Sequence, residues 1–149
     1  MTEELPEINL KPIGTVRSEI KEPIRHDCKD VVSEIVVDSS LTEALDNLNE
    51  FSHIIVLYWI HKSPHRAPKK VRPRGNPERE LTGVFATRSP DRPNPIGKTT
   101  VRLLERRDNV LKVQGLDAID GTPVLDIKPY IPGYDSVDNA RAPSWMVKR

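Results

Sequence analysis

The sequence has 149 residues, a length typical of one domain that can form a hydrophobic core without a disulfide or a structural metal. Its net charge of +1 indicates no particular partner, and its single cysteine excludes an internal disulfide framework and is typical of a reducing cytoplasm. No signal-peptide pattern opens the sequence, and the longest apolar run, residues 54–60, is too short to cross a bilayer, so we expect a cytoplasmic protein.

The first half of the sequence predicts three strands and one helix. Residues 8–17 and the β-branched residues 31–37 predict strands, with Gly14 at a bulge or a close approach of two backbones. A capping-box pattern predicts a short amphipathic helix over residues 40–48. The stretch 51–60, which contains the apolar run 54–60, then predicts a strand that is buried on both faces.

In the second half, prolines exclude regular structure from residues 62–79. Residues 81–87 predict a short strand, residues 99–107 and 110–116 predict a β-hairpin, and residues 124–130 predict the last strand. About seven short strands with one short helix predict a mainly β fold, a small single-domain antiparallel β-barrel with long proline-rich loops.

The charges are distributed unevenly along the chain. Residues 1–61 carry 5 Lys or Arg against 12 Asp or Glu, whereas residues 62–107 carry 13 against 4. The basic middle third creates a local positive field. The alternative is a solvated basic surface that pairs with the acidic first third of the same chain or of a partner subunit.

The segment GVFATRSPDRPNPIGK, residues 83–98, is the most informative. Its three prolines fix φ and remove backbone donors, so the segment is stiff and pre-organised for binding. Cations on such a loop suit a carboxylate or a phosphate, and the alternative is a rigid connection that closes the barrel. The side chains expected to project from it are Arg88, Asp91, Arg92, Asn94 and Lys98.

Several chemistries are excluded by absent patterns, since the sequence has no glycine pair of a dinucleotide or phosphate loop, no GxSxG and no HExxH. His61 and His65 are four residues apart, but Pro64 between them breaks the helix that a metal pair would need, so we expect no metal. His61 alone follows a buried strand, where a rigid scaffold meets a loop. Cys28 is not expected to be a nucleophile.

Acidic residues characterise the last third. Asp120 belongs to an Asp-Gly turn, while Asp117 or Asp126 could hold a ligand amine or a cation. Lys128 and Tyr130 alternate with Asp126 and are therefore expected on the same strand face. An exposed strand face without function is the alternative.

Two motifs, GVFATRSPDRPNPIG (83–97) and LDAIDGTPVLDIKPY (116–130), closely resemble the paired signatures of the TsaA-like family, whose characterised members are tRNA adenosine N6-methyltransferases of the TrmO type. IGTVRS (13–18) and FSHIIVLYWIHKS (51–63) resemble the first strand and the strand-plus-histidine of the same family. We therefore expect one domain with a core of about 11–133 and an irregular tail, 134–149, for which Trp145 and Met146 are available as anchors.

The resemblance implies a small barrel that binds S-adenosylmethionine, works as a homodimer without metal or membrane, and methylates N6 of threonylcarbamoyl-adenosine beside the anticodon of tRNA. The cofactor contacts that it implies are Arg25, His26, Asp27, His61, Lys62, Arg88, Lys98, Gln114, Gly115, Leu116 and Asp117. The stretch EPIRHDC departs from the usual proline-arginine-glutamine pattern of the family at the first three of these.

For the RNA, the basic loop is expected to supply phosphate contacts, and a tyrosine, Tyr130 or Tyr58, is expected to stack on a splayed-out base. The RNA-binding candidates are Lys69, Lys70, Arg72, Arg74 and Arg92. Asp126 is the candidate to orient or deprotonate the acceptor nitrogen, with Lys128 and Tyr130 beside it. Two alternatives stay open, a non-catalytic RNA-binding barrel and a methyltransferase that acts on another acceptor.

Overall fold

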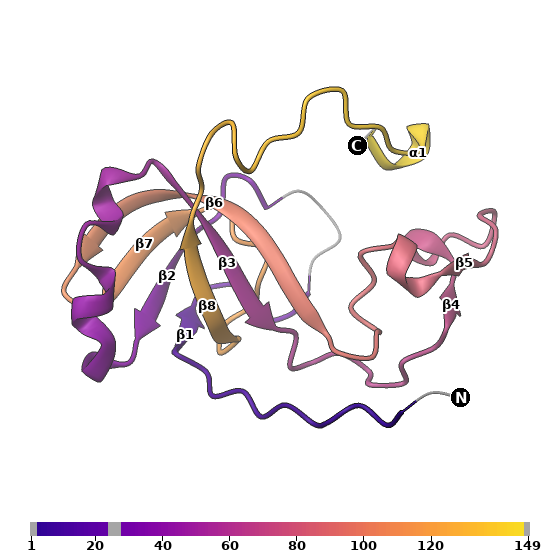
Figure 1. Cartoon of the computed structure of the whole chain (residues 1–149), viewed down its shortest axis with the longest axis horizontal. Coiled ribbons are helices and arrows are strands. Elements are labelled where there is room, and N and C mark those ends of the chain that lie inside the picture. The colour runs from indigo at the N-terminus through magenta and orange to yellow at the C-terminus, as the bar shows by residue number, and fades with distance from the viewer. Residues whose placement is uncertain (1–2, 24–27, 148–149) are drawn as a thin grey trace.

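The computed structural model describes residues 3–23 and 28–147, and within them six strands close into an antiparallel barrel in the order β1-β2-β7-β6-β3-β8 (Figure 1). The barrel strands are β1 (Gly14–Arg17), β2 (Val32–Val37), β3 (His53–Trp59), β6 (Ile96–Arg107), β7 (Val110–Gln114) and β8 (Pro123–Pro129). The predicted mainly β fold and antiparallel barrel are therefore confirmed. No helix in these residues is long and apolar enough to cross a membrane.

Smaller elements decorate the barrel. A two-stranded sheet, β4 (Lys70–Val71) with β5 (Thr82–Gly83), lies to one side of it in the long connection between β3 and β6 (Figure 1). The helical turns are η1 (Ser39–Leu45), η2 (Leu48–Glu50), η3 (Pro73–Gly75), η4 (Val84–Ala86) and α1 (Ser144–Val147). We call residues 60–95 the β3–β6 connection.

The core fills the inside of the barrel, because alternate strand residues point inward. β2 contributes Ile35 and Val37, and β7 contributes Leu111 and Val113, all of them buried. In β3 three successive residues are buried, so the prediction of a strand covered on both faces is confirmed. The long strand β6 pairs with β3 through its first half and with β7 through its second half, which confirms the hairpin.

Four local predictions were wrong. The predicted helix 40–48 consists of the 3₁₀ turns η1 and η2, because Asp38 accepts the Ser40 backbone N–H at 2.9 Å and Asn47 adopts a left-handed φ of 71°. The first strand covers only β1, the second part of the predicted range. The predicted strand 81–87 is divided between β5 and η4, and the 62–79 segment contains β4 and η3 despite its prolines.

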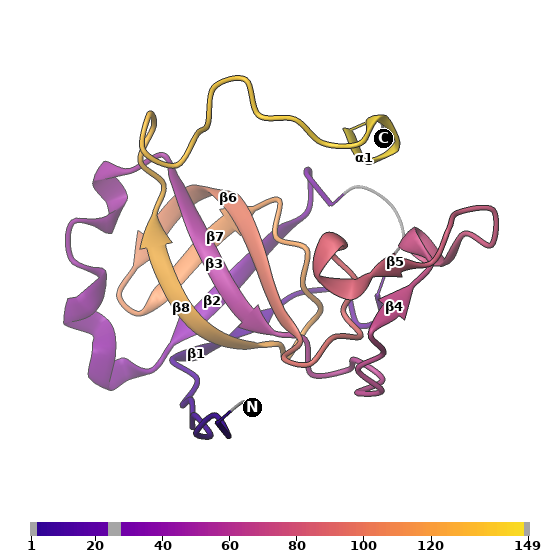
Figure 2. The same cartoon turned by 45° about the vertical axis from the view of Figure 1, so that its right-hand side comes forward.

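The connections gather at two opposite ends of the barrel. η1, η2 and the β6–β7 turn lie at one end, and the β1–β2, β3–β6 and β7–β8 connections lie at the other (Figure 2). We call this second end the loop end. Because strands alternate in direction, it receives the end of β3, the start of β6 and the chain after β7.

The C-terminal tail leaves β8, passes over the barrel and reaches α1 beside the β3–β6 connection (Figure 1). There the guanidinium of Arg79 lies 5.2 Å from the ring centre of Trp145. Arg74 Nη2 donates to the carbonyl of Met146 at 3.4 Å. The side chain of Trp145 therefore contacts the β3–β6 connection as expected, whereas the contact at Met146 is made by its backbone carbonyl.

Two glycines allow close approaches that any side chain would block. A Cβ at Gly14 would meet the carbonyl oxygen of Val36 on β2, so the predicted close approach of two backbones is confirmed. A Cβ at Gly97 would meet the ring of Tyr58. The ring of Tyr58 therefore crosses the inside of the barrel directly over Gly97, its partner on β6.

Gly97→Ala is expected to destabilise the fold by about 1–3 kcal/mol, because the added methyl overpacks the Tyr58 ring against a closed barrel. The matched control is Gly83→Ala, where an added Cβ meets no atom within 4 Å. Urea unfolding of both variants measures the difference. Equal stabilities of the two variants would contradict this account of the barrel interior.

Candidate functional site

Tyr58 is the centre of a buried polar group at the loop end. Its side chain, only 6% exposed, donates from the hydroxyl to the carbonyl of Asp117 at 2.8 Å. Thr99 Oγ1 lies 2.9 Å from the same hydroxyl oxygen. A phenol has one proton, so Thr99 is the donor in the second bond. The two bonds tie β3, β6 and the β7–β8 connection together.

Burial raises the pKa of Tyr58 to about 12, so the hydroxyl stays protonated and keeps donating even at pH values where an exposed tyrosine ionises. The hydrogen bond from Thr99 lowers this pKa. The charges of Asp117 and Cys28 raise the pKa further, and the guanidinium of Arg88 lowers it. Asp117, Cys28 and Arg88 are thus close enough to Tyr58 to shift the pKa of its hydroxyl.

The segment from Gln114 to Asp117 turns from the barrel wall into the loop end. Gln114 ends β7 opposite Arg102, and Gly115 makes the turn with a φ of +98°. Leu116 is fully buried in the core, whereas the Asp117 side chain is exposed. Cys28 Sγ donates to Asp117 Oδ1 at 3.6 Å. Of the four predicted cofactor residues here, only Asp117 offers a charged group to the loop end.

The other cofactor candidates are distributed around this centre. Arg88 is exposed and has no hydrogen bond or ion pair with the described residues. His61 follows β3 and is half-buried, and Lys62 pairs with Glu22 at 3.6 Å. Lys98 lies on the outer wall of the barrel, since its neighbour Thr99 points inward. Arg25, His26 and Asp27 lie outside the described residues.

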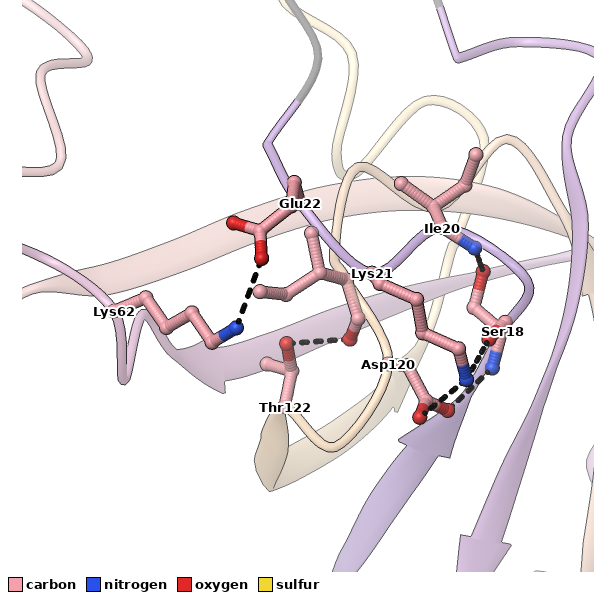
Figure 3. Close-up of polar contacts among 8 residues, drawn as sticks. Ser18, Ile20, Lys21, Glu22, Lys62, Asp120 and Thr122 are labelled. Atoms are coloured by element: carbon pink, nitrogen blue, oxygen red, sulfur yellow. Dashed lines mark hydrogen bonds and ion pairs between the residues drawn. The ribbon is translucent and has the colours of Figure 1, made fainter.

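Asp120 joins two connections of the loop end. Its carboxylate accepts the backbone N–H of Ser18 at 2.9 Å and the ammonium of Lys21 at 2.8 Å (Figure 3). The bond from Lys21, together with that from Ser18, lowers the pKa of Asp120. The predicted Asp-Gly turn is confirmed by the φ of +82° at Gly121. The turn therefore fixes the β1–β2 connection to the β7–β8 connection.

The proline-rich segment is cross-linked to the start of the β3–β6 connection. Asp91, 6% exposed, accepts the backbone N–H groups of Arg66 and Ala67, each at 2.9 Å, and Arg66 Nε at 3.0 Å. Arg92 Nη1 donates to the carbonyls of Thr87 and Ser89 at 3.0 and 3.1 Å. The expectation that Asp91 projects from the segment was wrong, because backbone N–H groups hold its carboxylate inside.

The predicted catalytic residues lie on and beyond β8. Asp126 and Lys128 share the outer face, as predicted, and form an ion pair at 3.1 Å. Leu57 on β3 stands between Asp126 on one side and Lys98 on the other. Tyr130 packs edge-on against His53 with ring centres 6.4 Å apart, at the opposite end from Arg88 and Asp117.

The RNA-binding candidates other than Arg92 lie on β4 and around η3, and all are exposed or half-exposed at the surface of the connection. Lys69 and Lys70 have no hydrogen bond or ion pair from their side chains within the described part of the chain. Arg72 donates to the carbonyl of Arg79 at 2.6 Å, so it also holds the shape of the connection. The prediction that Tyr58 stacks on a base was wrong, because the barrel encloses its ring.

Sequence reasoning missed Thr99. The signal was present, since Gly97, Thr99 and Val101 alternate on β6 and a polar residue therefore falls on the inward face. It dismissed Cys28 as a nucleophile, and the structure gives that thiol a hydrogen bond to Asp117. Within the described residues, no group of three or more His, Cys, Asp or Glu side chains is arranged to hold a metal ion.

A separate hollow of about 720 Å³ opens between the β1–β2 connection and the walls of β2, β6 and β7. Its charged lining is largely paired within itself, with Arg17 on Glu34 at 2.7 Å and Arg107 on Glu105 at 3.1 Å. Tyr58 and Asp117 do not line it. The loop end, where Arg88 has no partner in the described part of the chain, is the better candidate for a site.

Tyr58→Phe tests the buried hydroxyl. At neutral pH the variant is expected to lose about 1–3 kcal/mol, because the Asp117 carbonyl loses its donor. Tyrosine ordinarily has a pKa near 10, and the pKa of Tyr58 is about 12 when the protein is folded. Unfolding therefore releases a proton between these pH values, and the stability that the protonated phenol provides is lost as pH rises from 10 to 12.

The stability difference between wild type and Tyr58→Phe should thus shrink through this alkaline range when unfolding is followed in urea. Tyr134→Phe is the matched control, since Tyr134 is a tyrosine exposed to solvent. A difference that stays constant above pH 10 would contradict the raised pKa of Tyr58.

Comparison with known proteins identifies the family. The model of the tRNA-methyltransferase O N-terminal domain matches residues 16–136. An S-adenosyl-L-methionine-binding protein of Archaeoglobus fulgidus is 47% identical over 133 residues, which are 87% of this chain and 94% of that protein. A tRNA (adenine(37)-N6)-methyltransferase of Mus musculus is 51% identical over 98 residues, which are 64% of this chain and 22% of the mouse protein.

Among solved structures, the crystal structure of TrmO from Pseudomonas aeruginosa matches with a TM-score of 0.77 and 34% identity. The match covers 93% of this chain and 62% of the TrmO chain, so this chain spans less than two thirds of that protein. Both the sequence and the fold agree over the barrel and its loop end. The chain therefore belongs to the TrmO family, through its match to the tRNA-methyltransferase O N-terminal domain.

Proposed function

We propose that this protein transfers a methyl group from S-adenosylmethionine to N6 of an adenosine in tRNA, with threonylcarbamoyl-adenosine beside the anticodon as the acceptor. The observation that carries the proposal is the family match over residues 16–136. This range includes all connections of the loop end and all six strands of the barrel, apart from the first two residues of β1. Relatives named as S-adenosyl-L-methionine-binding proteins and as a tRNA (adenine(37)-N6)-methyltransferase support it.

The described residues of the loop end fit this cofactor. S-Adenosylmethionine carries a carboxylate, an ammonium group and a sulfonium cation, and when bound it supplies an electrophilic methyl group. Arg88 is an exposed guanidinium without another partner in the described part of the chain, which suits a carboxylate. Asp117 is an exposed carboxylate in the same neighbourhood, which suits the cationic groups. We assign these two residues to the cofactor, with His61, Lys62 and Lys98 as further contacts.

Methyl transfer depends chiefly on alignment of donor and acceptor, and the residues around Tyr58 serve that need. The protonated Tyr58 hydroxyl holds the carbonyl of Asp117, and Asp120 holds the neighbouring connection. Both bonds are formed within the chain itself. The loop end is therefore pre-organised, which reduces the entropy that binding must overcome.

The acceptor N6 loses a proton when it gains the methyl group, and we assign that proton to Asp126. The Asp126 carboxylate is accessible on the outer wall, and Leu57 alone separates it from Lys98 in the cross-strand row. Lys128, paired with it at 3.1 Å, orients the carboxylate. The carbonyl of a carbamoylated N6 acidifies the proton, so a weak base is sufficient.

The phosphates of the tRNA are assigned to Lys69, Lys70, Arg72, Arg74 and Arg92 on the β3–β6 connection. This connection carries nine Lys or Arg against three Asp or Glu, and one of those acids, Asp91, is buried.

We also propose a homodimer that works in the cytoplasm. Tyr130 lies at the end of the barrel opposite the loop end of its own chain. In a dimer, the outer wall that carries Asp126, Lys128 and Tyr130 in one chain can lie against the loop end of the other chain, which supports a dimer.

The proposal predicts that cofactor and RNA binding can be weakened separately. Arg88→Ala should reduce cofactor affinity, measured by calorimetry, by about 1.5–3 kcal/mol, the contribution of a charged hydrogen bond. Lys69→Ala with Lys70→Ala should weaken tRNA binding and lower its salt slope by about 0.7–0.9 for each phosphate that is no longer neutralised. Lys112→Ala, an exposed lysine on β7, is the control for general charge. If both sets reduced both affinities equally, the division of roles would be wrong.

Asp126→Asn preserves shape and removes the charge. We expect both affinities to stay near wild type and single-turnover methylation to fall by ~10²-fold or more, the scale of general-base assistance. Asp46→Asn is the matched control, because Asp46 is also exposed and also paired, with Arg106 at 3.1 Å. A folded Asp126→Asn variant that methylates as fast as Asp46→Asn would remove Asp126 from the chemistry.

A further inference from the structure

Phe85 presents a large apolar ring to solvent, with 80% of the residue exposed. Its neighbours in the chain are anchored, since Val84 is buried and donates its backbone N–H to the carbonyl of Lys69 at 2.9 Å. Thr87, also buried, closes the turn with two bonds to the carbonyl of Val84, from its N–H at 3.1 Å and its hydroxyl at 2.7 Å. The exposure of the ring is thus imposed by an ordered turn, η4.

An exposed phenylalanine on an ordered turn forgoes the stabilisation that burial of its ring would provide. Isolated exposed apolar residues are common, so exposure alone indicates nothing. The surroundings of Phe85 distinguish it. On β4, Lys70 pairs directly with Gly83, two residues before the ring, and the carbonyl of Lys69 accepts the bond from Val84.

On the other side of the ring the chain leads to Arg88, which lies close to Tyr58 at the loop end. Phe85 therefore follows the strand pair at Lys69 and Lys70 and precedes Arg88 by three residues, and the side chains of these three cations have no partner among the described residues. An aromatic ring flanked by cations is the combination that binds single-stranded nucleic acid, where bases stack on the ring and phosphates meet the charges. The excess of basic residues in the β3–β6 connection disfavours a cationic or neutral partner.

The two tyrosines expected to stack on a base do not compete for this role. The ring of Tyr58 is inside the barrel, and Tyr130 packs on His53 at the opposite end. We infer that Phe85 is the stacking platform for an unpaired base of the RNA substrate, held between phosphate contacts at Lys69 and Lys70 and the methyl-donor side at Arg88. This inference rests on the proposed function and adds a positioning residue for the acceptor strand.

The test compares Phe85→Ala and Phe85→Trp with Leu81→Ala, which removes a nearby apolar side chain that is 55% exposed but not aromatic. An anticodon stem-loop carrying a fluorescent purine analogue in its loop reports both affinity and stacking. Phe85→Ala should weaken RNA binding by about 5- to 150-fold, the range expected when one base no longer stacks, and should abolish quenching of the analogue. Phe85→Trp should restore both, and Leu81→Ala should change the affinity less than about 2-fold.

Each other outcome is decisive. Wild-type RNA affinity in Phe85→Ala would overturn the platform while leaving the methyltransferase proposal intact. A loss of cofactor affinity in calorimetry would assign the ring to the adenine of the cofactor instead. Conversion of a dimer to a monomer in sedimentation would assign it to a second copy of the chain. Failure of the wild type itself to bind tRNA would overturn the proposed function together with the platform.

Discussion

The hydrogen bonds of the Tyr58 hydroxyl connect parts of the chain that are distant in sequence. The phenol, buried inside the barrel, reaches Thr99 on β6 and the carbonyl of Asp117 after β7. This reach requires the absence of a side chain at Gly97, over which the ring passes. Removal of any of these groups leaves a buried polar atom without its partner, which costs more than the bond itself contributes. The position of the loop end depends on this group.

The segment that carries Phe85 and Arg88 is ordered by a different device. The buried carboxylate of Asp91 accepts N–H groups from a stretch with left-handed backbone, where φ is +59° at His65 and +46° at Ala67. Such conformations are strained in these residues, and the bonds to the carboxylate compensate for that strain. Pro95 is buried and its carbonyl accepts the N–H of Ile60 at 2.7 Å. The exposed groups of this segment are consequently presented from a fixed backbone.

Much of the fold could be predicted from local sequence patterns. The alternation of β2 and of the β6–β7 hairpin specifies strands because the period of side chains is two, and the turn at Asp108 and Asn109 is a local signal. The helix at 40–48 failed because Asp38 and Asn47 offered competing local bonds and conformations. Thr99 and Phe85 could not be assigned roles, since one depends on closure of the barrel across 41 residues and the other on which side chains remain exposed.

The central claim of the proposed function is methylation of a carbamoylated adenosine in tRNA, and membership of the TrmO family supports the tRNA methyltransferase part of it. Mass spectrometry of anticodon-loop nucleosides tests it most directly, on tRNA with and without the threonylcarbamoyl group after incubation with the protein and S-adenosylmethionine. The account predicts one added methyl on the N6 of threonylcarbamoyl-adenosine, and none on the unmodified adenosine. Binding of the RNA with no methylated nucleoside would indicate a non-catalytic barrel, and a methyl group on another base would contradict the proposed acceptor.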